Sequence, residues 1–181
     1  MADELIDIFD ENNNSLNKTM MKSLAHKNGS WHRTSHIWIY NTKGEMLIQH
    51  RNHDKEIHPN LWDIGAAGHI PAGETPLQGA IRETEEEIGL EITAKELEFI
   101  QIKKGIANTN DKIQNNEFAY IYLLKYDGEI TDLKIQQEEL QDLKFIKLSK
   151  LKIELISNPK IYVPHLEYWH EMIKIIENKL K

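Results

Sequence analysis

The stretch of sequence that organises this chain is residues 68–90, which read GHIPAGETPLQGAIRETEEEIGL. Thr75 is a favourable helix N-cap, and Gln78 stands three residues later, where a capping box needs it. Gly89 is typical of the residue that follows a helix C-terminus. These signals predict a helix over residues 76–88, a length of about three to four turns.

Three glutamates of this predicted helix, Glu83, Glu86 and Glu87, fall within an arc of about 100°. Like charges three and four residues apart destabilise a helix by about a few tenths of a kcal/mol per pair. A hard divalent cation would offset that repulsion, and Mg²⁺ favours carboxylates together with water and phosphate oxygens. The alternative interpretation is a solvated acidic face, which is the usual meaning of a run of glutamates.

The glutamates belong to the longer pattern G-x5-E-x7-R-E-x-x-E-E-x-G, which begins at Gly68 and ends at Gly89. This pattern resembles the Nudix box of the Nudix hydrolases, and its full spacing favours a metal site over a solvated face. The resemblance implies an α/β fold, a Nudix-type α/β/α sandwich with a mixed central sheet. It also assigns site roles. The metal ligands would be Glu83, Glu86, Glu87 and the Gly68 carbonyl, and structural support of the box would come from Glu74 and Arg82.

A second resemblance extends over residues 31–90. The segments WHRTSHIWIYN, LIQHR and HPNLWDIGAAGHI are similar to type 1 isopentenyl-diphosphate isomerases and to the Nudix proteins related to them. The resemblance implies that His32 and His69 match positions that bind metal. It implies that Arg51 and Lys55 match cations that hold a diphosphate.

Each of these residues has a structural alternative. His32 at the start of a strand and His69 in a loop would then be ordinary structural histidines. Arg51 and Lys55 would be solvated surface charges. Glu117 lies near the late acidic ligand of the isomerases, and it is interpreted here as a catalytic base or an extra ligand; otherwise it is a charge on an edge strand.

One departure separates hydrolase from isomerase. The isomerases use a cysteine just before the Gly-His pair, and this chain has Ala67 there and no cysteine anywhere. The isomerases also dilute the box glutamates, whereas this chain keeps all three. Both differences favour hydrolysis.

Composition limits the remaining function classes. The 181 residues suffice for a single domain over 1–181, in which residues 1–30 form an N-terminal extension to the box-containing part. A net charge of −7 argues against binding to a nucleic-acid polymer or an anionic membrane. The acidic N-terminus has no signal-peptide core, so we expect a cytoplasmic protein.

The pattern elsewhere predicts short strands interleaved with helices. Residues 15–30 show no clear pattern, and a polar loop is expected between the strands over 97–106 and 117–126. The other predicted strands cover residues 5–9, 31–40, 45–50, 61–67 and 143–148. A C-terminal helix is predicted over 164–180.

The sequence therefore predicts a Mg²⁺-dependent hydrolase, with Mn²⁺ as an alternative ion, that cleaves a diphosphate linkage in a nucleoside diphosphate or its conjugate. Glu86 and Glu117 are both candidates for the general base, and a homodimer is an open alternative to a monomer. Two other functions are kept as alternatives. One is isopentenyl-diphosphate isomerisation, and the other is nucleotide binding without turnover.

Overall fold

The computed structural model describes residues 3–110 and 113–181. Strands are interleaved with helices along the chain, as the sequence pattern predicts. The elements are β1 (Leu5–Phe9), β2 (Ser15–Met21), α1 (Lys22–Asn28), β3 (His32–Tyr40), β4 (Glu45–Arg51), β5 (Trp62–Ile64), β6 (Ala66–His69), α2 (Pro76–Ile88), β7 (Leu97–Asn110), β8 (Ile113–Lys125), the 3₁₀ turn η1 (Ile130–Asp132), β9 (Leu140–Lys147), α3 (Leu148–Ser157), the 3₁₀ turn η2 (Pro159–Ile161) and α4 (Leu166–Lys179).

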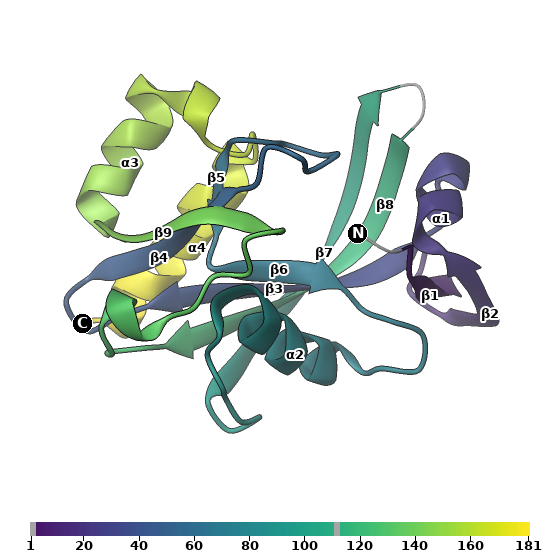
Figure 1. Cartoon of the computed structure of the whole chain (residues 1–181), viewed down its shortest axis with the longest axis horizontal. Coiled ribbons are helices and arrows are strands. Elements are labelled where there is room, and N and C mark those ends of the chain that lie inside the picture. The colour runs from purple at the N-terminus through teal and green to yellow at the C-terminus, as the bar shows by residue number, and fades with distance from the viewer. Residues whose placement is uncertain (1–2, 111–112) are drawn as a thin grey trace.

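The main sheet is mixed, with β3 at its centre (Figure 1). Its principal strand order is β5-β4-β3-β8-β7, with β6 paired to β3 and β9 paired to β4. Strand β3 runs antiparallel to β4 and β6 and parallel to β8. The parallel pairing places His32 opposite Glu117, and the antiparallel pairing with β6 places Thr34 opposite His69. Residues from three distant parts of the sequence thus meet along one strand.

Helices cover both faces of this sheet. Alternate residues of β3 point to opposite faces, so Ile37 and Ile39 pack in the core beneath α2, whereas Trp38 packs in the core beneath α3 and α4. Burial of these apolar side chains is the main favourable term in folding. The predicted α/β/α arrangement with a mixed sheet is confirmed.

Helix α2 begins and ends as predicted. The Thr75 hydroxyl accepts a hydrogen bond from the Gln78 backbone N–H at 3.3 Å, and the Gln78 side chain accepts one from the Thr75 N–H at 2.9 Å. Gly89 ends the helix with φ +66° in the left-handed region, where glycine is unstrained. Gly79 is explained by close packing, because a Cβ there would lie 3.1 Å from Ile70 Cγ1.

Several elements differ from the sequence-based prediction. The sequence predicts no helix or strand over residues 15–28, but they form β2 and α1 in the structure. Because β2 is almost wholly exposed, its sequence does not alternate between polar and apolar residues. The predicted polar loop after residue 106 is largely strand, and its tip at 111–112 lies outside the described residues. The predicted strand over 61–67 is two strands separated at Gly65.

Helix α3 was not predicted either. It buries Leu148, Leu151 and Leu155 but leaves Ile153 and Ile156 at the surface. Because α3 has apolar residues on its exposed side as well as on its buried side, its sequence shows no clear helical period.

The N-terminal segment packs directly against the loop that precedes α2. The Ala72 N–H donates to the Leu5 carbonyl at 2.9 Å, and Ile6 forms an isolated β-bridge with Pro71. In Figure 1, β1, β2 and α1 lie beside that loop at one end of the molecule. Across the described ranges, no helix is both long and apolar enough to span a bilayer.

Candidate active site

In the candidate site, strand β6 lies directly against α2. A Cβ built on Gly68 would lie 2.0 Å from Glu83 Cδ and within 2.3 Å of both carboxylate oxygens. Only a residue without a side chain allows the Glu83 carboxylate to sit against the backbone of β6. Burial raises the pKa of Glu83 to about 7, although the neighbouring Arg82 acts in the opposite direction.

Glu87 lies deeper, and its side chain is almost completely buried. Its Oε2 atom accepts hydrogen bonds from the Ala67 backbone N–H at 3.0 Å and from Gln49 Nε2 at 3.3 Å. Burial raises the pKa of Glu87 to about 8, and the charge of Glu83 adds to the effect. A buried carboxylate and a largely covered one on consecutive turns of one helix are costly without a cation nearby.

Arg82 connects four groups of the box. Its Nη1 atom lies 2.8 Å from Glu83 Oε1 and 2.7 Å from Glu86 Oε2. Its Nε donates to Glu74 Oε2 at 3.2 Å, and its Nη2 donates to the His69 carbonyl at 2.9 Å. Glu86 differs from the other two glutamates of the motif, because more than half of its side chain is exposed and Arg82 engages one of its oxygens.

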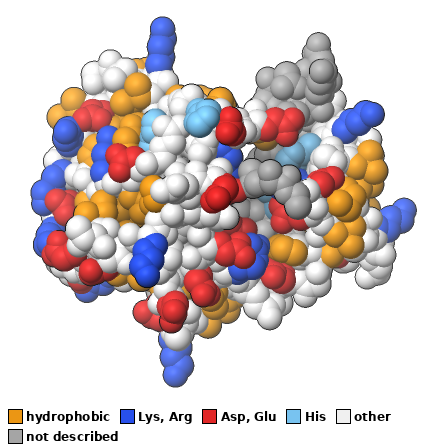
Figure 2. All heavy atoms as spheres, in the orientation of Figure 1, with side chains coloured by type: hydrophobic (Ala, Val, Ile, Leu, Met, Phe, Trp, Pro, Cys, Tyr) orange, Lys and Arg blue, Asp and Glu red, His pale blue; other side chains and the backbone are white. Residues whose placement is uncertain are grey.

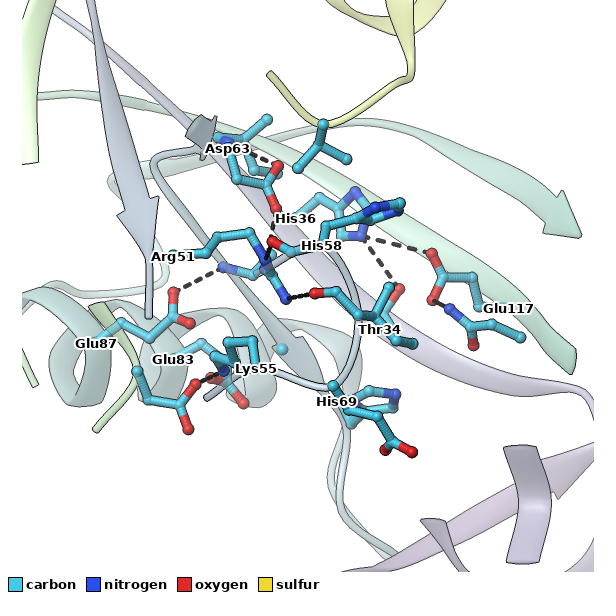
Figure 3. A pocket seen from close by; sticks show the side chains of 18 of the residues that line it. Thr34, His36, Arg51, Lys55, His58, Asp63, His69, Glu83, Glu87 and Glu117 are labelled. Carbon is cyan, nitrogen blue, oxygen red and sulfur yellow. Dashed lines mark hydrogen bonds and ion pairs between the residues drawn. The ribbon is translucent and has the colours of Figure 1, made fainter. Parts of the chain in front are cut away.

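The two cations matched to a diphosphate site, Arg51 and Lys55, line the same cavity, and Lys55 lies close to Glu83 (Figure 3). Arg51 donates to Asp63 Oδ2 at 3.0 Å and to the carbonyls of His58 and Ile57 at 3.1 and 3.0 Å. Lys55 forms an ion pair with the buried Glu139, and burial lowers the pKa of Lys55. Both cations therefore already have partners that a bound phosphate would have to share or replace.

Glu117 enters the cavity from β8. Its Oε2 atom accepts from Asn115 Nδ2 at 3.0 Å, and its Oε1 atom lies 3.8 Å from His36 Nε2. Burial lowers the pKa of His36, and the charge of Glu117 opposes the change. His36 was not among the site residues proposed from sequence, since a histidine in the middle of a strand carries no signal that separates it from a core residue.

Three histidines form a separate cluster near the N-terminal segment. His26, His32 and His69 offer ring nitrogens that all lie within 4.8 Å of one another. His26 Nε2 lies 3.2 Å from His69 Nε2, and His32 Nε2 is buried with no hydrogen-bond partner among the described residues. The sequence pattern points to His32 and His69 but not to His26, because His26 lies on α1, a helix that the pattern does not predict.

Burial keeps these imidazoles neutral. It lowers the pKa of His26 to about 4, with a further contribution from His32. Burial also lowers the pKa of His32, and the pKa of His69 lies well below its ordinary value because of burial and the neighbouring His32. Neutral imidazole is the form that binds metals, and nitrogen ligands suit transition metals better than Mg²⁺.

A single cavity of about 1080 Å³ joins most of these groups. On the face of the molecule that Figure 2 shows, acidic side chains lie near the middle, with histidines close by. Of the residues proposed from sequence, Glu74 and His32 do not line the cavity. Those that do are Arg51, Lys55, Gly68, His69, Arg82, Glu83, Glu86, Glu87 and Glu117.

The two candidate donor sets differ in chemistry. At α2 the candidate ligands are carboxylate oxygens packed against a glycine, and this set fits a hard cation such as Mg²⁺. At the N-terminal segment the candidates are three imidazole nitrogens, one of them an unpartnered buried atom, and this set fits a borderline transition metal.

Comparison with known proteins shows the family of this chain. A family model described as the NUDIX domain matches residues 30–166. Nudix hydrolase 3 of Arabidopsis thaliana is 33% identical over 169 residues, which cover 91% of this chain but only 22% of the plant protein. A Nudix hydrolase of Listeria innocua is 33% identical over 162 residues, and the match covers 88% of each chain.

More distant similarity reaches the isomerases. Isopentenyl-diphosphate Delta-isomerase 1 of Aromatoleum aromaticum is 28% identical over 171 residues, covering 94% of this chain and 90% of that protein. The resemblance to both groups that the sequence motifs indicated is confirmed.

Solved structures share the fold. The crystal structure of DR0079 from Deinococcus radiodurans aligns with a TM-score of 0.71 at 18% identity, covering 93% of this chain and 98% of that one. A MutT protein from Methanosarcina mazei aligns with a TM-score of 0.61 at 19% identity, covering 82% of this chain and 96% of that one.

Proposed function

The chain belongs to the NUDIX domain family, and we propose that it cleaves a diphosphate linkage in a nucleoside diphosphate or its conjugate with Mg²⁺. Its relatives establish the general class, a hydrolase that acts on diphosphate bonds. The observation that carries the finer proposal is a pair of carboxylates on α2, the buried Glu87 and the largely covered Glu83, with Glu83 seated against Gly68.

Nudix hydrolases generally use divalent metal ions. We assign the ion to Glu83, Glu86, Glu87 and the Gly68 carbonyl. When bound there, a divalent cation neutralises phosphate oxygens and lowers the pKa of a coordinated water. Mn²⁺ is an alternative ion for the same oxygen ligands.

The side chains around this ion have distinct roles in the proposal. Arg82 and Glu74 hold the loop against α2, while Arg51 and Lys55 orient the diphosphate. Glu117 is favoured over Glu86 as the general base, because Arg82 already occupies Glu86 whereas Glu117 faces the cavity beside His36. We place a second metal position at His26, His32 and His69.

Isomerisation of isopentenyl diphosphate is the second candidate, and the three-histidine cluster favours it. Against it stands Ala67, which occupies the place of the isomerase cysteine in a chain without any cysteine. Incorporation of solvent deuterium into an isoprenoid product would establish isomerisation. An absence of exchange with Mg²⁺, Mn²⁺ and Zn²⁺ would remove this candidate.

Oligomeric state enters the proposal through the N-terminal segment. Large apolar side chains stay exposed there, namely Leu5, Leu16, Met21 and Leu24. We propose that a homodimer uses this surface. Light scattering on the wild type and on Leu16→Ser tests it, and a monomeric wild type at high protein concentration would contradict it.

Product analysis on a panel of diphosphates with Mg²⁺ tests the function directly. The panel holds nucleoside diphosphates, nucleotide conjugates and isopentenyl diphosphate, and each is incubated with the wild type, Glu87→Gln and Glu85→Gln. Glu85 is an exposed residue of the same helix, so it provides a matched change of charge. Cleavage that survives in Glu85→Gln and disappears in Glu87→Gln supports the proposal. Equal cleavage by all three proteins would refute it.

A further inference from the structure

A chain of hydrogen bonds fixes the protonation of His36. Trp38 Nε1, which can only donate, lies 2.9 Å from the Tyr168 hydroxyl. The same hydroxyl lies 3.1 Å from His36 Nδ1, and Tyr168 is buried. The Tyr168 proton is satisfied when His36 Nδ1 accepts it, so the single proton of a neutral His36 stays on Nε2.

His36 Nε2 points into the cavity without a close acceptor (Figure 3). Two oxygens face it, Thr34 Oγ1 at 3.5 Å and Glu117 Oε1 at 3.8 Å. Both distances exceed the usual 2.7–3.2 Å range of N–H···O hydrogen bonds. Asn115 donates a hydrogen bond to the other oxygen of Glu117, Oε2, and so holds this carboxylate in place. A fixed donor is thus available to a ligand.

The wall around His36 carries polar groups among aromatic and apolar ones, which include Val163, Tyr168 and Trp169. Thr34, His58, Asp63 and His165 line the cavity on this side of the diphosphate-binding cations, and the rings of His58 and His165 meet edge to face with centroids 5.9 Å apart. A plain alkyl chain placed here would exclude water from the His36 Nε2–H without offering it an acceptor, which is costly. A ring that carries an acceptor would satisfy this donor.

We propose that His36 determines specificity, with its Nε2–H donating to an acceptor on the non-phosphate half of the substrate. Tyr168 and Trp38 are positioning residues that hold this donor in place. The site then takes diphosphates whose other half is a nucleoside and rejects those that carry a plain alkyl chain. The inference rests on the proposed function for the placement of the diphosphate itself.

Binding of non-hydrolysable probes tests the inference independently of turnover. The probes are the α,β-methylene diphosphates of the four common ribonucleosides and isopentyl methylenediphosphonate. Calorimetry with Mg²⁺ compares the wild type with His36→Leu, His36→Gln and Tyr168→Phe. We expect the wild type to bind at least one nucleoside probe at least about tenfold more tightly than the alkyl probe, since sites built to hydrogen-bond reject analogues that cannot.

The variants separate a specificity role from a structural one. His36→Leu should lose most of that preference by weakening the nucleoside probe alone. His36→Gln should keep much of it, because its amide N–H reaches a similar position. Tyr168→Phe should lower the preference several-fold, since His36 then has no partner that fixes its proton. Loss of affinity for both probes alike in His36→Leu, or an unchanged preference in Tyr168→Phe, would overturn the inference.

Two outcomes distinguish this inference from the proposed function. A wild type that binds both classes of probe equally, or prefers the alkyl probe, overturns the role of His36 even if nucleoside diphosphates are cleaved. A preference that depends on His36, found in a protein that cleaves no matching diphosphate, supports the role of His36 and contradicts the proposed hydrolysis.

Discussion

Gly68 and Glu83 are so close that a methyl group on the glycine would overlap the carboxylate, with Cβ 2.0 Å from Cδ. The contact joins β6 to α2 and sets the position of a candidate metal ligand. It also means that the smallest possible change at residue 68 has to move that ligand.

Gly68→Ala should therefore lower turnover at least about 100-fold, because a displacement of about 1 Å at a reacting centre has an effect of this size. The measurement is the rate of diphosphate cleavage as a function of Mg²⁺ concentration. Gly44→Ala is the control, since nothing lies within 4 Å of its Cβ and its φ of +71° makes it destabilising without touching the site. Equal turnover in the two variants would contradict the assignment of Glu83.

The metal-free protein should become less stable between about pH 6.5 and 8. The raised pKa values of Glu83, about 7, and Glu87, about 8, mean that the folded state holds protons that the unfolded state has lost. The free energy of unfolding then falls as pH rises. Between about pH 4 and 6.5 His26 contributes in the opposite direction, because its pKa of about 4 in the folded state lies below its ordinary value of 6.5.

Urea unfolding at a series of pH values, with EDTA or with Mg²⁺, measures this slope. Mg²⁺ should reduce it, because the ion replaces the protons. Glu87→Gln should reduce it as well, whereas Glu85→Gln should keep the wild-type slope. If the stability of the metal-free wild type stayed constant or rose from pH 6.5 to 8, the pKa values of the two carboxyls would not be raised.

Replacement of Arg82 should affect both stability and turnover. Arg82→Gln leaves Glu83, a side chain only 12% exposed, without its neighbouring cation. A loss of about 1–3 kcal/mol in the free energy of unfolding is expected for a lost charged hydrogen-bond partner of this kind. Lysine should restore little, because it lacks the planar fork that reaches Glu74 and the His69 carbonyl together.

Urea unfolding and cleavage assays on Arg82→Gln and Arg82→Lys test this expectation. Lys103→Gln is the comparison, since it removes a surface ion pair with Glu171 whose contribution should be small. If Arg82→Gln behaved like Lys103→Gln in both assays, Arg82 would be an ordinary surface charge.

The three-histidine cluster should bind a transition metal in addition to the Mg²⁺ proposed at the carboxylates of α2. Co²⁺ or Zn²⁺ titrated at pH 7.5 should bind at least about tenfold more weakly to His26→Gln and His69→Gln, because each loses one nitrogen ligand. His53→Gln is the matched control, because His53 is largely exposed and is not one of the three histidines of the cluster. Wild-type affinity in His26→Gln would show that the cluster is structural.

Sequence alone determined the features that depend on neighbours within one or two helical turns. Helix α2 has the predicted ends because Thr75, Gln78 and Gly89 act on backbone groups at most a few residues away. The placement of Glu83 and Glu87 on one side of it follows from helical geometry. The mixed sheet with helices on both faces followed from the interleaved pattern and from the family resemblance.

Tertiary structure alone decided which distant residues meet. His26, His32 and His69 come from α1, β3 and β6, and the hydrogen-bond chain of His36 runs to Tyr168 on α4. Such contacts depend on strand register and on how helices pack across the sheet, and no local pattern encodes either. The raised pKa values of Glu83 and Glu87 likewise arise from burial, which exists only after the chain has folded around them.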